Sequence, residues 1–279
     1  MKCFILYFSI LFAIQDAGAI INGTEIQSHD PSPFVGMEFQ VSGTYGSDLC
    51  SGTYLGNGKI ITAAHCFLLN EYPAEKIQIC FTDLSKKLNL CLPDSTFAVS
   101  FPPVIEWGGK APTRKSHKVI QIPRPDMALL QINPTEISKF EFLKPANIWN
   151  GIQPLEKTTI VGQGCTNYAS FGEAMIGQGT FRSGDVILSS QLETTEWSSV
   201  WTVDSKNSGV CWGDSGGALL GFANGESYLS GIISGMRTKH DPTTGAPAIV
   251  TSRYGRLDHP EIQKWLKQNG INYLVQPLQ

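Results

Sequence analysis

Short β-branched segments recur along almost the whole chain, and they constrain its fold more than any other feature. Each has three to five residues and is bounded by Gly, Pro, Asn or Ser, as in strands joined by tight turns. The 28 glycines and the 16% of charged residues favour this arrangement over a helical bundle. With 279 residues, the chain can form one large all-β domain or two small ones. The expected strands are Lys59–Thr62, Ile77–Ile79, Lys118–Ile122, Met127–Leu130, Thr158–Val161, Asp185–Leu188 and Leu229–Ile233.

One helix is expected near the C-terminus. Asp258 can cap its N-terminus, Pro260 can occupy its first turn, and Gly270 can end it. Between them, apolar residues follow a helical spacing, at Ile262, Trp265 and Leu266. The sequence therefore predicts an all-β fold with a terminal helix.

The first 19 residues have the features of a secretory signal peptide. Lys2 precedes an apolar run of eleven residues, Phe4 to Ile14, which is too short to span a bilayer. Ala17, Gly18 and Ala19 then fit the small-residue cleavage pattern. We therefore expect a secreted protein, extracellular or periplasmic, although a buried N-terminal strand or helix is the alternative. No later segment is long and apolar enough to cross a membrane.

The cysteines agree with export. Removal of residues 1–19 takes away Cys3 and leaves six of the seven cysteines. An even number in an exported chain indicates three disulfides, but six cysteines allow fifteen pairings, so the count alone leaves the pairs open. The net charge of −3 gives no reason to expect nucleic acid or an anionic membrane as partner.

The run Gly213-Asp214-Ser215-Gly216-Gly217 has the composition of a nucleophile loop. A serine hydroxyl needs a neighbouring base, and small glycines let backbone N–H groups point at a developing oxyanion. The run also matches the G-x-S-x-G elbow of α/β-hydrolases, in which an acid and a histidine follow the serine. Candidates for both do follow, but the alternating strands and long helices of a parallel sheet are missing. A glycine-rich turn without chemistry is the third interpretation.

Two further segments separate these interpretations. Thr62-Ala63-Ala64-His65-Cys66 and Asp126-Met127-Ala128-Leu129-Leu130 precede the Ser215 run, in the order His, Asp, Ser. Together the three segments resemble the trypsin/chymotrypsin family. The resemblance extends from Ile20 to the terminal helix. It implies a protease domain over residues 20–279, with two six-stranded antiparallel β-barrels, a boundary near residues 133–150 and an active site between the barrels.

The resemblance also assigns roles. His65 would take the proton of Ser215 and pass one to the leaving amine, while Asp126 fixes the histidine tautomer. The backbone N–H groups of Gly213 and Ser215 would form the oxyanion hole. Ser234 matches a serine that lies beside the aspartate and pairs with the substrate backbone.

A chain that begins at Ile20-Ile21-Asn22-Gly23 resembles the activated N-terminus of the family, with Asn22 in place of a glycine. In the family the freed amine pairs with the aspartate before the nucleophile, here Asp214, and orders the oxyanion hole and the pocket. No propeptide stands between Ala19 and Ile20. We therefore hypothesise that signal cleavage itself creates the active N-terminus.

The resemblance suggests three disulfide pairs. Cys50 and Cys66 match the family's histidine-loop disulfide, and Cys80 and Cys91 would close a local hairpin in a region that is longer than in trypsin. In trypsin the cysteine at the position of Cys211 pairs with a downstream cysteine, but none follows here. Cys165 lies on a loop that approaches the active site in the family. The expected third pair is Cys165–Cys211.

The family resemblance also bears on substrate specificity. Gly209 stands where trypsin has the aspartate that binds Lys or Arg, and Val210 follows it. Met236 matches a position that narrows the pocket, and Ala248 is expected on the opposite wall. We therefore expect cleavage after small or medium apolar residues, more elastase- or chymotrypsin-like than trypsin-like. Arg237 and Lys239 leave a preference for acidic residues as the alternative.

The overall expectation is a secreted, monomeric serine endopeptidase that acts on proteins or peptides, with proteinaceous inhibitors as candidate partners. No membrane anchor and no cofactor are expected. No metal is expected either, because the acidic residues near a loop that binds calcium in some family members lack a recognisable ligand spacing. These residues are Glu71, Glu75, Asp83 and Asp94. A non-catalytic binding homologue on the same fold and an α/β-hydrolase esterase are the alternatives.

Overall fold

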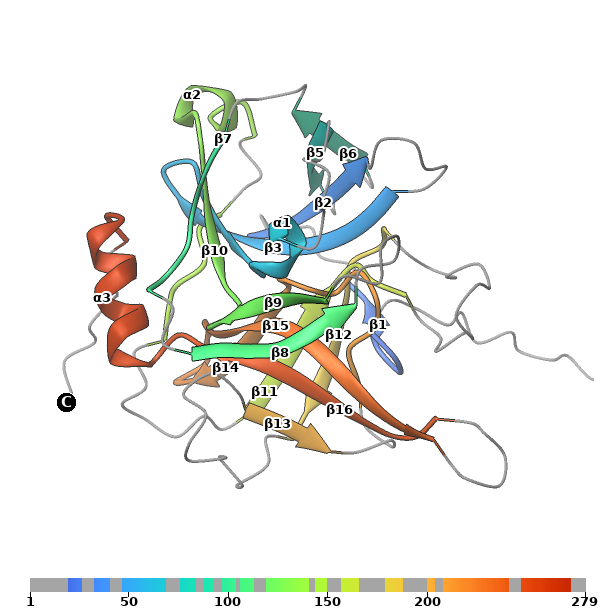
Figure 1. Ribbon diagram of the computed structural model, residues 1–279. Coiled ribbons are helices and arrows are strands. Elements are labelled where there is room, and N and C mark those ends of the chain that lie inside the picture. Colours follow the sequence, from blue (N-terminus) through green and yellow to red (C-terminus); the bar gives the residue numbers. More distant parts are fainter. Residues whose placement is uncertain are drawn as a thin grey trace, which may run out of the picture.

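The structure is a computed structural model of the chain. It describes residues 20–26, 33–40, 47–68, 76–83, 88–92, 97–103, 106–112, 119–140, 144–149, 157–165, 179–187, 200–203, 208–240 and 247–271. Two antiparallel sheets, packed one above the other in the view of Figure 1, make up most of the molecule. The predicted all-β class is confirmed. Residues 1–19, expected to be a signal peptide, lie outside the described part.

The first sheet contains the N-terminal half of the chain. Its seven strands follow the order β6-β5-β2-β3-β4-β10-β7 and are antiparallel. Figure 1 shows β2 and β3 curving around the interior of this sheet. Its strands are β2 (Phe34–Gln40), β3 (Ser47–Gly56), β4 (Lys59–Thr62), β5 (Lys76–Asp83), β6 (Leu88–Leu92), β7 (Phe97–Ser100) and β10 (Ala128–Ile132).

The second sheet is built mainly from the C-terminal half. Its seven strands follow the order β1-β12-β11-β14-β15-β16-β13 and are again antiparallel. They are β1 (Thr24–Glu25), β11 (Lys157–Gly162), β12 (Arg182–Val186), β13 (Val200–Val203), β14 (Ala218–Ala223), β15 (Glu226–His240) and β16 (Pro247–Arg256).

The strand number differs from the six per barrel that the family resemblance implies. Each sheet gains a short edge strand that pairs with one neighbour only. In the first sheet this is β6, the second arm of a hairpin that the Cys80–Cys91 disulfide closes. In the second sheet it is β1, which has two residues. The pairing of β1 with β12 joins residues far apart in the sequence, which local patterns do not reveal.

The expected strands agree with the observed ones except at their ends. Asp185–Leu188 was expected to be extended throughout, but β12 ends at Val186, and the side chain of Ile187 is 73% exposed. Between β7 and β10 the chain adds a hairpin, β8 (Glu106–Pro112) and β9 (Val119–Arg124), which forms a separate two-stranded sheet. This hairpin lies between His65 and Asp126, where the family resemblance predicted an insertion.

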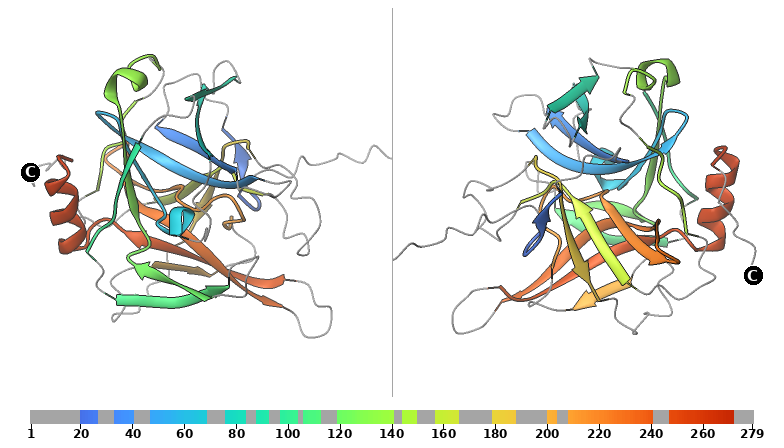
Figure 2. Two further views of the ribbon diagram at one scale, coloured as in Figure 1. Left: turned by 45° about the horizontal axis from the view of Figure 1, so that its top comes forward. Right: turned by 180° about the vertical axis from the view of Figure 1, so that it is seen from behind.

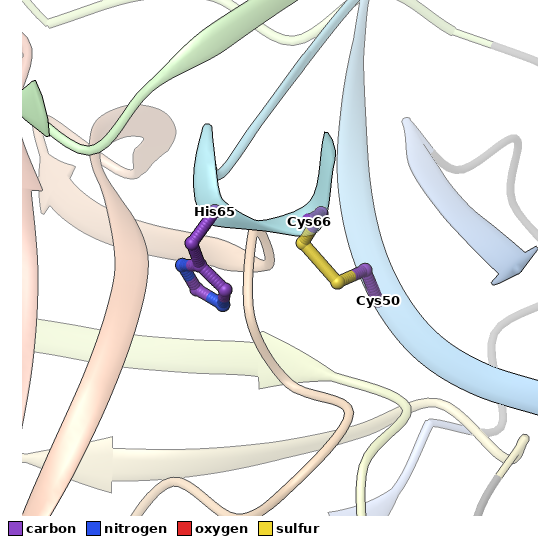
Figure 3. A group of neighbouring side chains, drawn as sticks. All are labelled: Cys50, His65 and Cys66. Atoms are coloured by element: carbon purple, nitrogen blue, oxygen red, sulfur yellow. A yellow bond between two sulfur atoms is a disulfide. The ribbon is translucent and has the colours of Figure 1, made fainter. Parts of the chain in front are cut away.

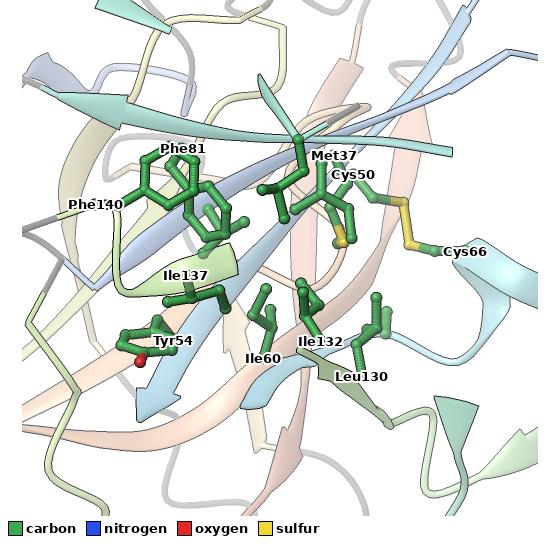
Figure 4. Packing of buried hydrophobic residues seen from close by; sticks show 14 residues of the cluster. Met37, Cys50, Tyr54, Ile60, Cys66, Phe81, Leu130, Ile132, Ile137 and Phe140 are labelled. Atoms are coloured by element: carbon green, nitrogen blue, oxygen red, sulfur yellow. A yellow bond between two sulfur atoms is a disulfide. The ribbon is translucent and has the colours of Figure 1, made fainter. Parts of the chain in front are cut away.

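Three apolar clusters fill the interior. The first lies inside the first sheet, where β-branched and aromatic side chains such as Ile60, Ile132 and Phe81 interlock (Figure 4). The second joins the two sheets, because Ile61 and Leu129 of the first sheet pack with Leu229 and Ile232 of the second. Burial of these side chains, at about 25 cal/mol per Å² of apolar surface, is the main stabilising contribution. The third cluster surrounds Ile20 and is described with the active site.

The C-terminal helix α3 (Pro260–Gln268) forms where expected, but with a different cap. His259, not Asp258, is the N-cap residue, and its Nδ1 accepts a hydrogen bond from the Glu261 N–H at 3.3 Å. The Asp258 carboxylate pairs instead with the Arg256 guanidinium, so it does not cap the helix. The apolar side chains of the helix are buried in the second cluster, and Figure 2 shows α3 beside β7 and β10.

A short connection leads from the first sheet to the second. After β10, Asn133 caps α2 (Pro134–Ile137), and the chain then reaches β11. On the way, Ile148 forms an isolated bridge with Leu229 of β15. The part of this segment that the structure describes falls within the region 133–150, where the boundary between the two halves was expected. Among the described residues, no helix is long and apolar enough to cross a membrane.

Candidate active site

His65 and Asp126 come from the same end of two neighbouring strands. β4 and β10 are antiparallel partners, with Thr62 opposite Ala128. His65 follows Thr62 by three residues and begins the short helix α1 (His65–Leu68), while Asp126 precedes Ala128 by two. Sheet register therefore brings together two residues that are 61 positions apart in the sequence.

The Asp126 carboxylate receives three hydrogen bonds. Its Oδ2 lies 2.7 Å from His65 Nδ1 and 2.7 Å from the Ser234 hydroxyl, which donates to it. Its Oδ1 accepts the backbone N–H of His65 at 2.9 Å. These contacts come from β15 and α1 and hold the carboxylate from two sides.

These contacts also determine the charges of the pair. Burial raises the pKa of Asp126, but the charge of His65 and the three hydrogen bonds outweigh burial and lower the pKa below its usual value. Burial lowers the pKa of His65, but the Asp126 charge and hydrogen bond outweigh it and raise the pKa. Asp126 is thus ionised at neutral pH and stabilises a protonated His65.

Ser215 lies on a loop that packs directly against the His65 segment. Its carbonyl accepts the backbone N–H of Ser51 at 2.7 Å. The neighbouring Cys50 is bound to Cys66, which follows His65 in the chain. The next residue, Gly216, has φ of 84°, and a Cβ there would overlap Thr62 Oγ1 and the Ser51 carbonyl. Only glycine fits this close approach, which brings the Ser215 loop onto the end of β4.

The Cys50–Cys66 disulfide and the His65 ring are close neighbours, and Figure 3 shows the ring beside the disulfide. Two cysteines and a histidine at this spacing can bind zinc when the sulfurs are thiolates. Here both sulfurs belong to the disulfide, so they are not thiolate ligands. Of the acidic residues that the sequence analysis considered for calcium, none has a side chain in the described part.

Asp214 is fully buried beside the Ser215 loop. Its Oδ1 accepts the Gly164 N–H and its Oδ2 accepts the Cys211 N–H, both at 2.7 Å. Burial nevertheless raises the pKa of Asp214 to about 7, because the two donors offset only part of the desolvation. Gly213, the preceding residue, has φ of 95°, which glycine adopts at low cost.

Ile20 is fully buried in the third apolar cluster, together with Val210, Ile233 and Tyr254. The next residue, Ile21, exchanges two backbone hydrogen bonds with Gly209, at 2.8 and 3.1 Å. Ile20 has φ of 60°, which is unfavourable for a β-branched residue. The N-terminal segment is therefore inserted beside segment 208–211, which precedes the Ser215 loop.

The residues expected to shape the pocket come from segment 208–211, β15 and β16. Gly209 is buried and carries no side chain, and Val210 belongs to the third cluster. Met236 is half-buried and packs against that cluster. Ala248 is part of β16, but its side chain lies outside the described part, as do those of Arg237 and Lys239.

The three disulfides match the pairs that the family resemblance suggests. They are Cys50–Cys66, Cys80–Cys91 and Cys165–Cys211. Cys80 and Cys91 face each other across the β5–β6 hairpin. The Cys165–Cys211 disulfide joins the loop after β11 to the segment that leads into the Ser215 loop.

Sequence reasoning missed two polar residues beneath the Ser215 loop and one exposed residue on it. Ser51 is fully buried, and its hydroxyl donates to the Gly213 carbonyl at 3.0 Å and accepts the Gln163 N–H at 3.1 Å. The Gln163 side chain donates to the Cys50 carbonyl at 2.9 Å. Trp212 is 47% exposed, next to Gly213. A serine and a glutamine within ordinary strand patterns carry no local signal of such contacts.

Comparison with known proteins identifies the family. Among solved structures, the chain is similar to neuropsin, a serine protease expressed in the limbic system of mouse brain. The TM-score is 0.59 at 19% identity, over 90% of this chain and 100% of that one, so the likeness concerns the fold. No curated protein sequence matches the chain. The family model for trypsin matches residues 20–255, and the chain therefore belongs to the trypsin family of serine proteases.

Proposed function

We propose that the protein is an active, secreted serine endopeptidase, with Ser215 as nucleophile, His65 as general base and Asp126 orienting the histidine. The observation that carries this proposal is the 2.7 Å contact between His65 Nδ1 and an Asp126 carboxylate that two further donors hold in place. A carboxylate held in this way keeps the proton of the ring on Nδ1. Nε2 is then free to accept a proton from a nucleophile.

The proposed reaction is the one that the triad performs in this family. Ser215 Oγ attacks the scissile carbonyl while His65 Nε2 takes its proton, and a tetrahedral oxyanion forms. The backbone N–H groups of Gly213 and Ser215 are the proposed oxyanion donors. His65 next gives its proton to the leaving amine, which leaves an acyl-enzyme on Ser215. Water, activated by the same histidine, hydrolyses this ester and regenerates the serine.

Secretion and activation are proposed as one event. Cleavage after Ala19 would free the amine of Ile20, whose side chain is buried and whose neighbour Ile21 pairs with Gly209. The buried Asp214 carboxylate, which the N–H donors alone stabilise incompletely, would gain a cationic partner. Cleavage also removes the unfavourable φ of Ile20, because a terminal residue has no such torsion. N-terminal sequencing of the secreted protein tests this, and a start at any other residue would refute it.

For specificity we propose a preference for small or medium apolar residues before the scissile bond. Gly209 offers no carboxylate to a basic side chain, and Met236 and Val210 are apolar neighbours. Protein or peptide substrates are expected, with proteinaceous inhibitors as candidate partners and a monomer as the acting form. Cleavage-site profiling with a peptide library measures the preference. Efficient cleavage after Lys or Arg would contradict it.

A fluorophosphonate probe tests the catalytic assignment directly. The secreted protein should be labelled at Ser215, and a His65→Ala variant should lose both labelling and peptide hydrolysis. A folded wild-type protein that does not react would support the non-catalytic binding homologue instead. The α/β-hydrolase alternative is wrong, because the chain belongs to the trypsin family and both large sheets are antiparallel.

A further inference from the structure

The Cys165–Cys211 disulfide lies against the segment that carries the proposed oxyanion donors. Each half of the disulfide donates its own backbone N–H to that segment. The Cys165 N–H donates to the Trp212 carbonyl at 2.8 Å, and the Cys211 N–H donates to the Asp214 carboxylate at 2.7 Å. Both cysteines are buried, so neither bond competes with bulk water.

The first of these bonds controls the direction of the Gly213 N–H. This N–H and the Trp212 carbonyl belong to one planar trans peptide, so they point in opposite directions. When the carbonyl faces Cys165, the N–H faces away from it. Rotation of this peptide would turn the donor out of position, and Gly213, with φ of 95°, offers little steric resistance to such a rotation.

Ser51 holds the other side of Gly213. Its hydroxyl donates to the Gly213 carbonyl at 3.0 Å, and its backbone N–H donates to the Ser215 carbonyl at 2.7 Å. The carbonyls of three residues, Trp212, Gly213 and Ser215, are therefore held from two elements, β3 and the loop after β11. The disulfide is the covalent connection between that loop and the nucleophile segment.

We propose that the Cys165–Cys211 disulfide and the Ser51 hydroxyl are positioning groups that orient the Gly213 N–H for the oxyanion. This inference rests on the proposed protease function and deepens it. It departs from the arrangement that trypsin uses, because no cysteine follows Cys211 in this chain. Without the disulfide, the chain still contains the triad, but the Trp212–Gly213 peptide can rotate.

If the Cys165–Cys211 disulfide only stabilised the fold, its loss would not specifically lower kcat. A second disulfide of the chain serves as the matched control. Cys80–Cys91 closes the β5–β6 hairpin at the edge of the first sheet, whereas the Ser215 loop packs on β3 and the end of β4. We would compare Cys165→Ala/Cys211→Ala with Cys80→Ala/Cys91→Ala, so that each variant loses one disulfide and leaves no free thiol. Ser51→Ala is the independent second variant, which leaves all disulfides intact.

Steady-state rates on one peptide amide distinguish a disulfide that positions the oxyanion donor from one that only stabilises the fold. Loss of a whole oxyanion donor costs about 10²- to 10³-fold in kcat, so a misoriented donor should cost at least about 10-fold. We expect this loss of kcat, with KM changed less than about threefold, in Cys165→Ala/Cys211→Ala (the 165/211 variant) and in Ser51→Ala. The 80/91 variant should keep the kcat of the wild type. Affinity for a peptide aldehyde, which forms a tetrahedral adduct, should fall in parallel with kcat.

Hydrogen exchange gives a readout that does not depend on activity. In the 165/211 variant the amides of residues 164–165 and 211–214 should exchange faster, while the 80/91 variant should keep their wild-type protection. If the wild type hydrolyses no peptide, the proposed function fails, and exchange still tests the positioning. Wild-type kcat in both Ser51→Ala and the 165/211 variant, or unchanged exchange around Gly213, would overturn the inference. If the 165/211 variant does not fold, Ser51→Ala decides.

Discussion

The pKa of Asp214 leads to a prediction about the uncleaved N-terminus. In a chain that keeps Ala19, the nitrogen of Ile20 is an amide, and the partners of the Asp214 carboxylate among the described residues are the Gly164 and Cys211 N–H groups. Its pKa is then about 7 in the folded state, against an ordinary value of 3.8. Between these two values the folded chain holds a proton that the unfolded chain has released. The free energy of unfolding therefore falls as the pH rises through this range.

The magnitude follows from the same values. A difference of about three pKa units, at about 1.36 kcal/mol each, gives a total loss of about 4 kcal/mol. From pH 5 to pH 8, the part that the Asp214 carboxyl contributes is about 3 kcal/mol. In a chain that begins at Ile20, the ammonium group favours the ionised carboxylate, so this loss should largely disappear.

Urea unfolding at pH 5 and pH 8 measures the effect. All chains would carry Ser215→Ala, to prevent self-cleavage, and would begin either at Ala19 or at Ile20. Each would also be made with Asp214→Asn, because His65 has a raised pKa and titrates in the same direction. The difference between the Asp and Asn chains isolates Asp214. An Ala19 chain whose unfolding free energy changes with pH no more than that of its Asn counterpart would refute the reasoning.

Three further predictions concern the triad and its loop. Asp126→Asn should lower kcat about 10⁴-fold, because the amide no longer favours the Nδ1-protonated tautomer of His65; a wild-type rate on a peptide amide would contradict this role. The pH profile of kcat/KM should rise with pH and reach half of its maximum above 6.5, because the pKa of His65 is raised in the folded protein. A midpoint below that value would argue against the His65–Asp126 charge pair. Gly216→Ala should lower the thermal midpoint far more than Gly225→Ala, because both glycines have positive φ, 84° and 77°, but only the Gly216 site has no room for a Cβ. Equal shifts in the two thermal midpoints would show that backbone strain, and not the overlap with Thr62, causes the loss of stability.

Local patterns in the sequence predicted seven of the described strands, the terminal helix and the three motifs of the proposed triad. Ile60 and Ile61 follow the turn residues Asn57 and Gly58, and His65 and Ser215 stand in short motifs whose composition suits their proposed chemistry. These features are readable because each depends on neighbours within a few residues. The family resemblance then supplied the order of the triad and the disulfide pairs.

Only the tertiary structure decided how distant segments meet. His259 caps α3 in place of the expected Asp258, because Arg256 pairs with the Asp258 carboxylate. Ser51 and Gly213 are 162 residues apart, and their contact exists because the Ser215 loop packs on β3. A hydrogen bond between such residues depends on the burial and register of two whole sheets. The sequence therefore predicted the groups that react, while the packing of the two sheets determined how those groups are held.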